Sequence, residues 1–136
     1  MDFFSFLYKK QMIQIWGKSY ELDTKDPKKL DRNLRKVLLP ELLNSVKKWE
    51  DRLNVKVQRV SLQKMKTRWG SCNYRMHTIR FNTLLVHLPV EYLDYVVLHE
   101  LAHLIEPSHN AHFKSILSYH MPGWREIHKT LRNYRF

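Results

Sequence analysis

The five residues from His99 to His103 have the types and spacing of a hydrolytic zinc site, H-E-x-x-H. Residues i and i+4 share one face of an α-helix, so the imidazoles of His99 and His103 can reach the same ion. Glu100 projects beside that ion, where a carboxylate can take a proton from a metal-activated water. The motif therefore predicts a hydrolase that binds one zinc ion, with peptide bonds as the first expected substrate.

Catalytic zinc keeps three protein ligands and one open position, so a third ligand is expected. His109 and His112 both lie within loop reach of the motif, and their spacing does not decide between them. The only cysteine, Cys72, could bind zinc by type, but we interpret it as a small buried apolar residue because three histidines complete the site. His120 and His128 are interpreted as surface or boundary histidines.

The motif lies in a segment with a strong helical pattern. Pro89 and Glu91 suit the first turn of this helix, and apolar residues then cover almost its whole circumference up to Leu104. Such a helix belongs in the middle of a domain, where unpaired histidine and glutamate side chains would be costly. A bound metal removes that cost. Pro107 ends the helix within a turn of His103.

Two further helices are expected after the motif. Ser108 or Asn110 can cap a helix that runs to about residue 120, and residues 124–134 form a last amphipathic helix.

The elements before the motif include a hairpin, a long helix and a small sheet. Residues 12–22 alternate around a turn at Gly17-Lys18. An amphipathic helix with a basic face begins at Asp26-Pro27 and ends near residue 53; Pro40 predicts a kink or two abutting helices. Extended residues 55–67, a turn at Gly70-Ser71 and a strand over 77–82 then predict an antiparallel hairpin whose outer strand could bind an extended peptide.

Length and composition bound the fold. The 136 residues, 43% of them hydrophobic, suit one α+β domain, in which residues 1–55 give the hairpin and basic helix and residues 56–136 give the sheet and the catalytic core. A single cysteine suits a reducing cytoplasm. The first ten residues do not read as a signal peptide, and no apolar run is long enough to span a membrane. The oligomeric state does not follow from the sequence.

The positive charge is unevenly placed. The net charge is +11, and residues 24–68 hold 14 Lys/Arg against 5 Asp/Glu, whereas residues 99–136 hold 5 against 3. This excess favours DNA or another polyanion as a partner, with the basic face of the long helix as the first candidate contact; a solvated basic face is the alternative.

Several segments together resemble the YgjP-like metallopeptidases, relatives of the SprT-like zinc peptidases. The resemblance runs from about residue 60 to 135 and rests on four segments: Arg68-Trp69-Gly70-Ser71-Cys72, Ile79-Arg80-Phe81-Asn82 with Leu84 and Pro89, Asp94 to Leu104, and Met121-Pro122-Gly123-Trp124-Arg125-Glu126. It implies a small zincin-like domain, with an antiparallel sheet packed on the motif helix. Residues 1–55 resemble the family only weakly.

The resemblance also assigns roles. In SprT-like proteins the third ligand begins an H-x-x-x-F segment, which here runs from His109 to Phe113 and favours His109 over His112. It implies a zinc peptidase in which Glu100 is the general base, and the SprT-like relationship suggests protein substrates at or near nucleic acid.

Two other functions stay open. One is a nucleic-acid-binding module with a structural zinc site and little or no proteolysis; the other is a zinc hydrolase of a non-peptide amide. Glu100 separates the first from a peptidase, because a structural site needs no general base. A second oxyanion donor could come from Tyr119, His112 or Arg68. Arg68 and Trp69 either contact substrate or hold the turn.

Overall fold

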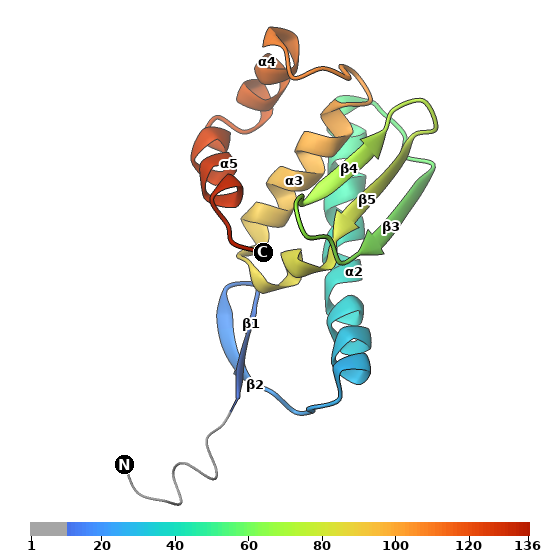
Figure 1. The fold of residues 1–136 in the computed structure, drawn as a ribbon. Coiled ribbons are helices and arrows are strands. Elements are labelled where there is room, and N and C mark those ends of the chain that lie inside the picture. The colour runs from blue at the N-terminus through green and yellow to red at the C-terminus, as the bar shows by residue number, and fades with distance from the viewer. Residues whose placement is uncertain (1–10) are drawn as a thin grey trace, which may run out of the picture.

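The computed structural model describes residues 11–136, and the prediction for the first ten residues lies outside them. Helices and strands follow one another along the chain (Figure 1). Their bounds are β1 Met12–Ile15, β2 Lys18–Glu21, α2 Pro27–Leu53, β3 Arg59–Gln63, β4 Gly70–Asn73, β5 Thr78–Asn82, the 3₁₀ helix η1 Thr83–His87, α3 Val90–Ala102, α4 Ala111–His120 and α5 Trp124–Arg132.

The predicted amino-terminal hairpin is confirmed, with its turn one residue earlier than expected. Ile15 pairs with Lys18, so Trp16 and Gly17 form the turn, both with positive φ. A side chain on Gly17 would lie 2.9 Å from Cγ of Pro89, which explains the glycine there. The Trp16 amide donates to the carbonyl of Val86, and this bond fixes the hairpin to η1.

Helix α2 begins where the sequence predicts and continues through Pro40 without interruption. The carboxylate of Asp26 accepts the Lys28 amide at 3.1 Å and caps the helix. Pro40 lies on the exposed side, where water can satisfy the carbonyl that loses its donor. The alternative of two abutting helices is therefore wrong.

The central sheet has the order β3-β5-β4 and is mixed, so the prediction of a purely antiparallel sheet is wrong in part. Strand β5 pairs antiparallel with β4 but parallel with β3. Gly70 and Ser71 lie inside β4, and the turn falls at residues 74–77, where His77 has positive φ. Gly70 was misread as a turn residue because glycine serves equally where another side chain approaches the backbone.

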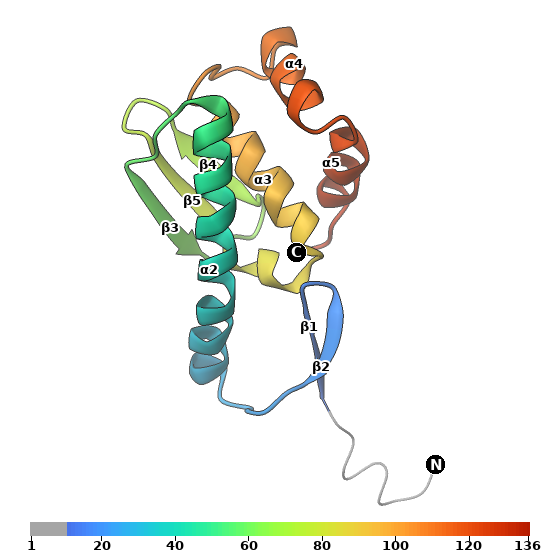
Figure 2. The same ribbon diagram turned by 180° about the vertical axis from the view of Figure 1, so that it is seen from behind.

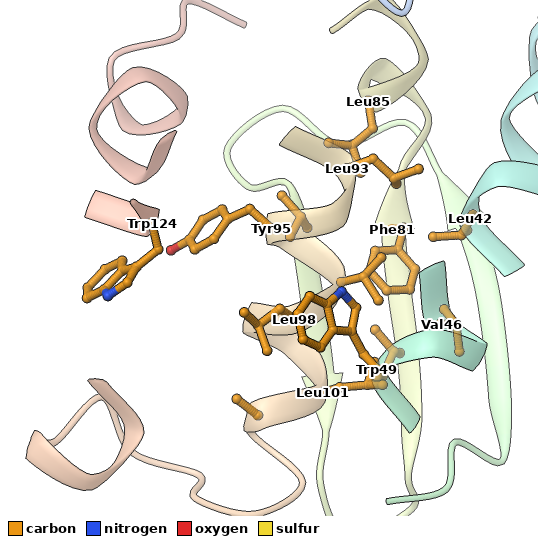
Figure 3. Packing of buried hydrophobic residues seen from close by; sticks show 14 of the residues in the cluster. Leu42, Val46, Trp49, Phe81, Leu85, Leu93, Tyr95, Leu98, Leu101 and Trp124 are labelled. Carbon is orange, nitrogen blue, oxygen red and sulfur yellow. The ribbon is translucent and has the colours of Figure 1, made fainter. Parts of the chain in front are cut away.

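Helix α3 lies between two groups of elements (Figures 1 and 2). Helix α2 and the inward face of the sheet pack on one side, and α4 and α5 lie on the other. Figure 3 shows Leu42, Val46 and Trp49 of α2 meeting Leu98 and Leu101 of α3. The α+β class and the buried motif helix are confirmed. None of the helices in the described part of the chain is long and apolar enough to cross a membrane.

Candidate active site

Three histidines converge at the end of α3. His99 lies in the last turn of α3, His103 is the residue that caps the end of this helix, and His109 returns from the segment that follows it. One ring nitrogen of each lies within 4.8 Å of the other two. In a tetrahedral zinc site with bonds of 2.0–2.1 Å, ligand nitrogens lie roughly 3.4 Å apart. The three imidazoles therefore fit one such ion with small side-chain movements.

Neighbouring groups orient the two helical imidazoles. Nδ1 of His103 lies 3.2 Å from the carbonyl oxygen of Glu106. A carbonyl oxygen only accepts, so this hydrogen bond requires the proton on Nδ1. Nδ1 of His99 lies 3.1 Å from Oε2 of Glu100. A neutral imidazole that donates from Nδ1 in either contact has Nε2 available to a metal, as is usual for histidine ligands.

Phe113 holds the histidines together. Its ring stacks on His103 at 4.4 Å between centroids, and it meets His99 at 5.1 Å and His109 at 5.0 Å edge-on. Asn110 positions this ring, because its side chain caps α4 by accepting the Phe113 amide at 3.0 Å. The H-x-x-x-F spacing thus has a physical basis: the phenylalanine buttresses the histidine that precedes it by four residues.

The local environment favours neutral imidazoles. Burial lowers the pKa of His103, which is only 9% exposed, and nearby His99 adds to the effect. Burial and the proximity of His99 also lower the pKa of His109. Neutral imidazole is the form that binds metal, so both side chains are ready at neutral pH.

Glu100 lies on the other side of the same turn and is 6% exposed. Its Oε2 accepts from His99, whereas Oε1 has no hydrogen bond among the described residues. No fully buried polar side-chain atom in residues 11–136 lacks a partner, so Oε1 must reach open space. Glu100 and His99 line a pocket of ≈ 220 Å³ together with Trp69, Gly70, Tyr95 and His128, which we call the Glu100 pocket.

The start of β4 is pressed against Glu100. A Cβ on Gly70 would lie 2.9 Å from Cγ and 3.2 Å from Oε2 of Glu100. Asn82, which is fully buried, fixes the loop before β4 by donating to the carbonyls of Met65 and Arg68 at 3.0 and 2.9 Å. Gly70 and Asn82 are therefore site residues whose roles the sequence did not reveal.

The candidate oxyanion donors Arg68, His112 and Tyr119 lie in different places, and Trp69 lies beside the first. Arg68 and Trp69 line the Glu100 pocket, and the Trp69 indole also donates to the Leu131 carbonyl at 3.1 Å. His112 is exposed, 3.6 Å from the Glu106 carboxylate. Tyr119 is 82% exposed, and its ring contacts His120 near the end of α4.

His128 was interpreted as a boundary residue, but it belongs to the site. Its Nδ1 lies 2.8 Å from the Tyr95 hydroxyl, and its ring stacks on His99 at 6.2 Å. Burial and Glu100 raise the pKa of Tyr95, which keeps it a neutral phenol. His128 lines both pockets that border His99. The helical spacing from buried Trp124 could have indicated that it faces inward. His120 instead packs on Trp49.

Cys72 lies in β4 and is half-buried. Burial and Glu100 together raise the pKa of its thiol to about 11, so it is protonated at neutral pH.

Comparison with known proteins places the chain in a family. A sequence model of the YgjP-like metallopeptidase domain matches residues 4–134, including the amino-terminal third, where the sequence resemblance is weak. Among solved structures, the chain is similar to the metallopeptidase zymogens abylysin of Pyrococcus abyssi (22% identity, TM-score 0.60, 65% of this chain and 90% of that one) and jannalysin of Methanocaldococcus jannaschii (25%, 0.57, 65% and 91%).

No curated protein gives a significant match. The family model nevertheless spans nearly the whole chain. The two solved structures share the fold of this protein over 65% of its length. The protein belongs to the YgjP-like metallopeptidase family.

Proposed function

We propose that the protein is a zinc endopeptidase in which His99, His103 and His109 hold one zinc ion and Glu100 is the general base. The observation that supports this most directly is the pairing of three converging imidazoles with a carboxylate that lines a pocket and has one oxygen without a hydrogen bond among the described residues. A purely structural metal site would not need that carboxylate.

When bound, zinc supplies Lewis acidity, which lowers the pKa of a water to about 7 from about 15.7 and polarises the scissile carbonyl. Oε1 of Glu100 takes the proton of the attacking water, while Oε2 stays hydrogen-bonded to His99. Glu100 then gives this proton to the leaving amine as the C–N bond breaks. Arg68 and His128 line the same pocket and are the groups best placed to donate to the developing oxyanion.

An extended, unfolded segment is the substrate that suits the surroundings. Strand β4 is an edge of the sheet and begins at Gly70, next to Glu100. A peptide that pairs with this edge would pass the Glu100 pocket. We place the protein in the cytoplasm, as its single cysteine suggests, with protein substrates at or near DNA as a further part of the proposal.

The test is Glu100→Gln, assayed for zinc content and for cleavage of an unfolded protein such as reduced casein, with and without DNA. We expect one zinc per chain in both proteins and a loss of cleavage of about 100-fold or more in the variant. Unchanged cleavage would overturn the role of Glu100, and wild-type protein without zinc would overturn the proposal as a whole.

Two other functions would give different results when cleavage of casein is measured together with stability after zinc removal and hydrolysis of small amides. A nucleic-acid-binding module with a structural zinc would lose stability when zinc is removed but would cleave no protein. A hydrolase of a non-peptide amide would show Glu100-dependent hydrolysis of small amides but not of casein.

A further inference from the structure

The outward face of the three-stranded sheet carries only polar and basic side chains. The strand register places them in two rows across β3, β5 and β4: Arg59, Thr78 and Asn73, then Ser61, Arg80 and Ser71. These six residues, together with Cys72 and Ile79, line a hollow of ≈ 370 Å³. None of the described helices covers this face (Figure 1), which we call the basic sheet face.

The charge of this region is not balanced by acidic residues. From residue 54 to residue 89 the chain has seven lysines and arginines and no aspartate or glutamate. No ion pair of the described residues involves Arg59 or Arg80. The segment therefore contributes +7 to the net charge of +11, although it is about a quarter of the chain.

Helix α2, the first candidate from sequence, is different. It carries eight lysines and arginines, but also four acidic residues. Arg35 pairs with Asp31 at 2.9 Å, Lys47 with Asp51 at 3.1 Å, and Lys48 with Asp94 of α3 at 2.6 Å. With its four acidic residues α2 has a net charge of +4, against +7 for residues 54–89, so the sheet is the stronger candidate for a polyanion.

An exposed aromatic residue stands at one end of the basic sheet face. Asn73 and Thr78 form the last pair of the β4–β5 ladder, and Tyr74 follows at once in the turn. Tyr74 is 42% exposed, and the Arg75 guanidinium lies 5.7 Å from its ring centroid. An aromatic face beside unpaired cations is how proteins bind single-stranded nucleic acid: bases stack on the ring while cations contact phosphates.

We propose that the basic sheet face binds single-stranded nucleic acid. Arg59 and Arg80 contact phosphates, helped by the hydroxyl and amide groups beside them, and Tyr74 stacks on a base. The face has no projecting helix to enter a duplex groove, which favours single strands over duplexes. The contact is independent of the metal centre, because these side chains point away from the face that packs on α3.

The test uses the whole protein and fluorescein-labelled dT12, followed by anisotropy between about 50 and 300 mM NaCl. The main variant is Arg59→Ser with Arg80→Ser. The charge-matched control is Lys28→Ser with Lys29→Ser, because both lysines are exposed at the start of α2. All four side chains lie outside the core, so thermal unfolding should match the wild type.

We expect the arginine variant to weaken binding at least 10-fold and to reduce the slope of log K against log salt by about 1.4, since each lost phosphate contact on a single strand removes about 0.7. Tyr74→Ala should weaken binding by roughly 5- to 100-fold. The lysine control should stay within about twofold of wild type, and Glu100→Gln should bind like wild type whether or not it cleaves protein.

Four results would overturn the proposal. The first two are a failure of the wild type to bind dT12 at 50 mM NaCl and a loss of dT12 affinity in the lysine control equal to that in the arginine variant. The third is tighter binding of duplex dA12·dT12 than of dT12. The fourth is complete displacement of dT12 by an equal concentration of a twelve-residue poly-glutamate. The last would indicate an acidic protein partner instead.

Discussion

The two sides of helix α3 at the active site are built in different ways. The ligand side consists of His99 and His103, which meet His109 and Phe113 from the segment directly after the helix. The base side consists of Glu100, which meets Gly70 from a strand about thirty residues earlier. The proposed ligands are therefore brought together by local sequence, whereas the position of the proposed general base depends on long-range packing. Variants should be able to impair one without the other.

The largest effect is expected on the ligand side. His109→Ala removes a proposed ligand, so zinc should fall from one ion per chain to a trace after dialysis, and cleavage should fall at least about 100-fold. Metal analysis and the casein assay measure both. His112→Ala is the control, because His112 is exposed and lies outside the histidine cluster. If His112→Ala lost zinc and His109→Ala kept it, the ligand assignment would be wrong.

On the base side, Gly70→Ala should reduce activity without removing zinc. The new Cβ would lie 2.9 Å from Cγ of Glu100, so the carboxylate must shift. A displacement of this kind can lower kcat by about 10- to 100-fold. Gly123→Ala is the matched control, because no atom lies within 4 Å of its new Cβ. Loss of zinc in Gly70→Ala would show that the two sides are not separable.

This difference explains how much of the site the sequence could predict. His99, Glu100 and His103 occupy one helical turn, so helical periodicity places them, and Asn110 and Pro107 mark the neighbouring boundaries. Their convergence with His109 follows from a short connection after α3. Their roles as ligands and base stay predictions that the experiments above test.

The residues that were missed all act across long sequence separations. Gly70 reads as a turn residue, since a sequence does not show that Glu100 approaches its backbone. The parallel pairing of β3 with β5 was missed for a related reason: the antiparallel hairpin of β4 and β5 gives a local turn signal, whereas a parallel neighbour gives none. His128 enters the site only through the packing of α5 beside Tyr95.

A smaller effect, on stability, is expected at Asn82. Asn82→Ala removes the donors to the Met65 and Arg68 carbonyls and should lower the free energy of unfolding by about 2 kcal/mol. This loop carries Trp69, which lines the Glu100 pocket, so KM should rise while the zinc content changes little. Gln63→Ala is the control, since Gln63 pairs with Asn82 across the sheet but is exposed. Denaturant unfolding measures the difference, and equal stability of the two variants would contradict it.

The smallest effect concerns Cys72, which reports on the base side without taking part in it. Burial and the negative charge of Glu100 disfavour its thiolate and raise the pKa to about 11. In the metal-free protein, the rate of alkylation by iodoacetamide should therefore still increase about tenfold per pH unit between pH 8 and 10. A thiol with the unperturbed pKa of about 8.5 would level off above pH 9.

Glu100→Gln should increase the Cys72 alkylation rate at each pH, because it removes the charge but not the burial. Unfolded protein in urea provides the control for an unperturbed thiol. If Glu100→Gln left the rate unchanged, the carboxylate would not act electrostatically on the Cys72 thiol of β4. The base side would then be joined to the sheet through the contact with Gly70 alone, and Gly70→Ala would be the only variant that reports on it.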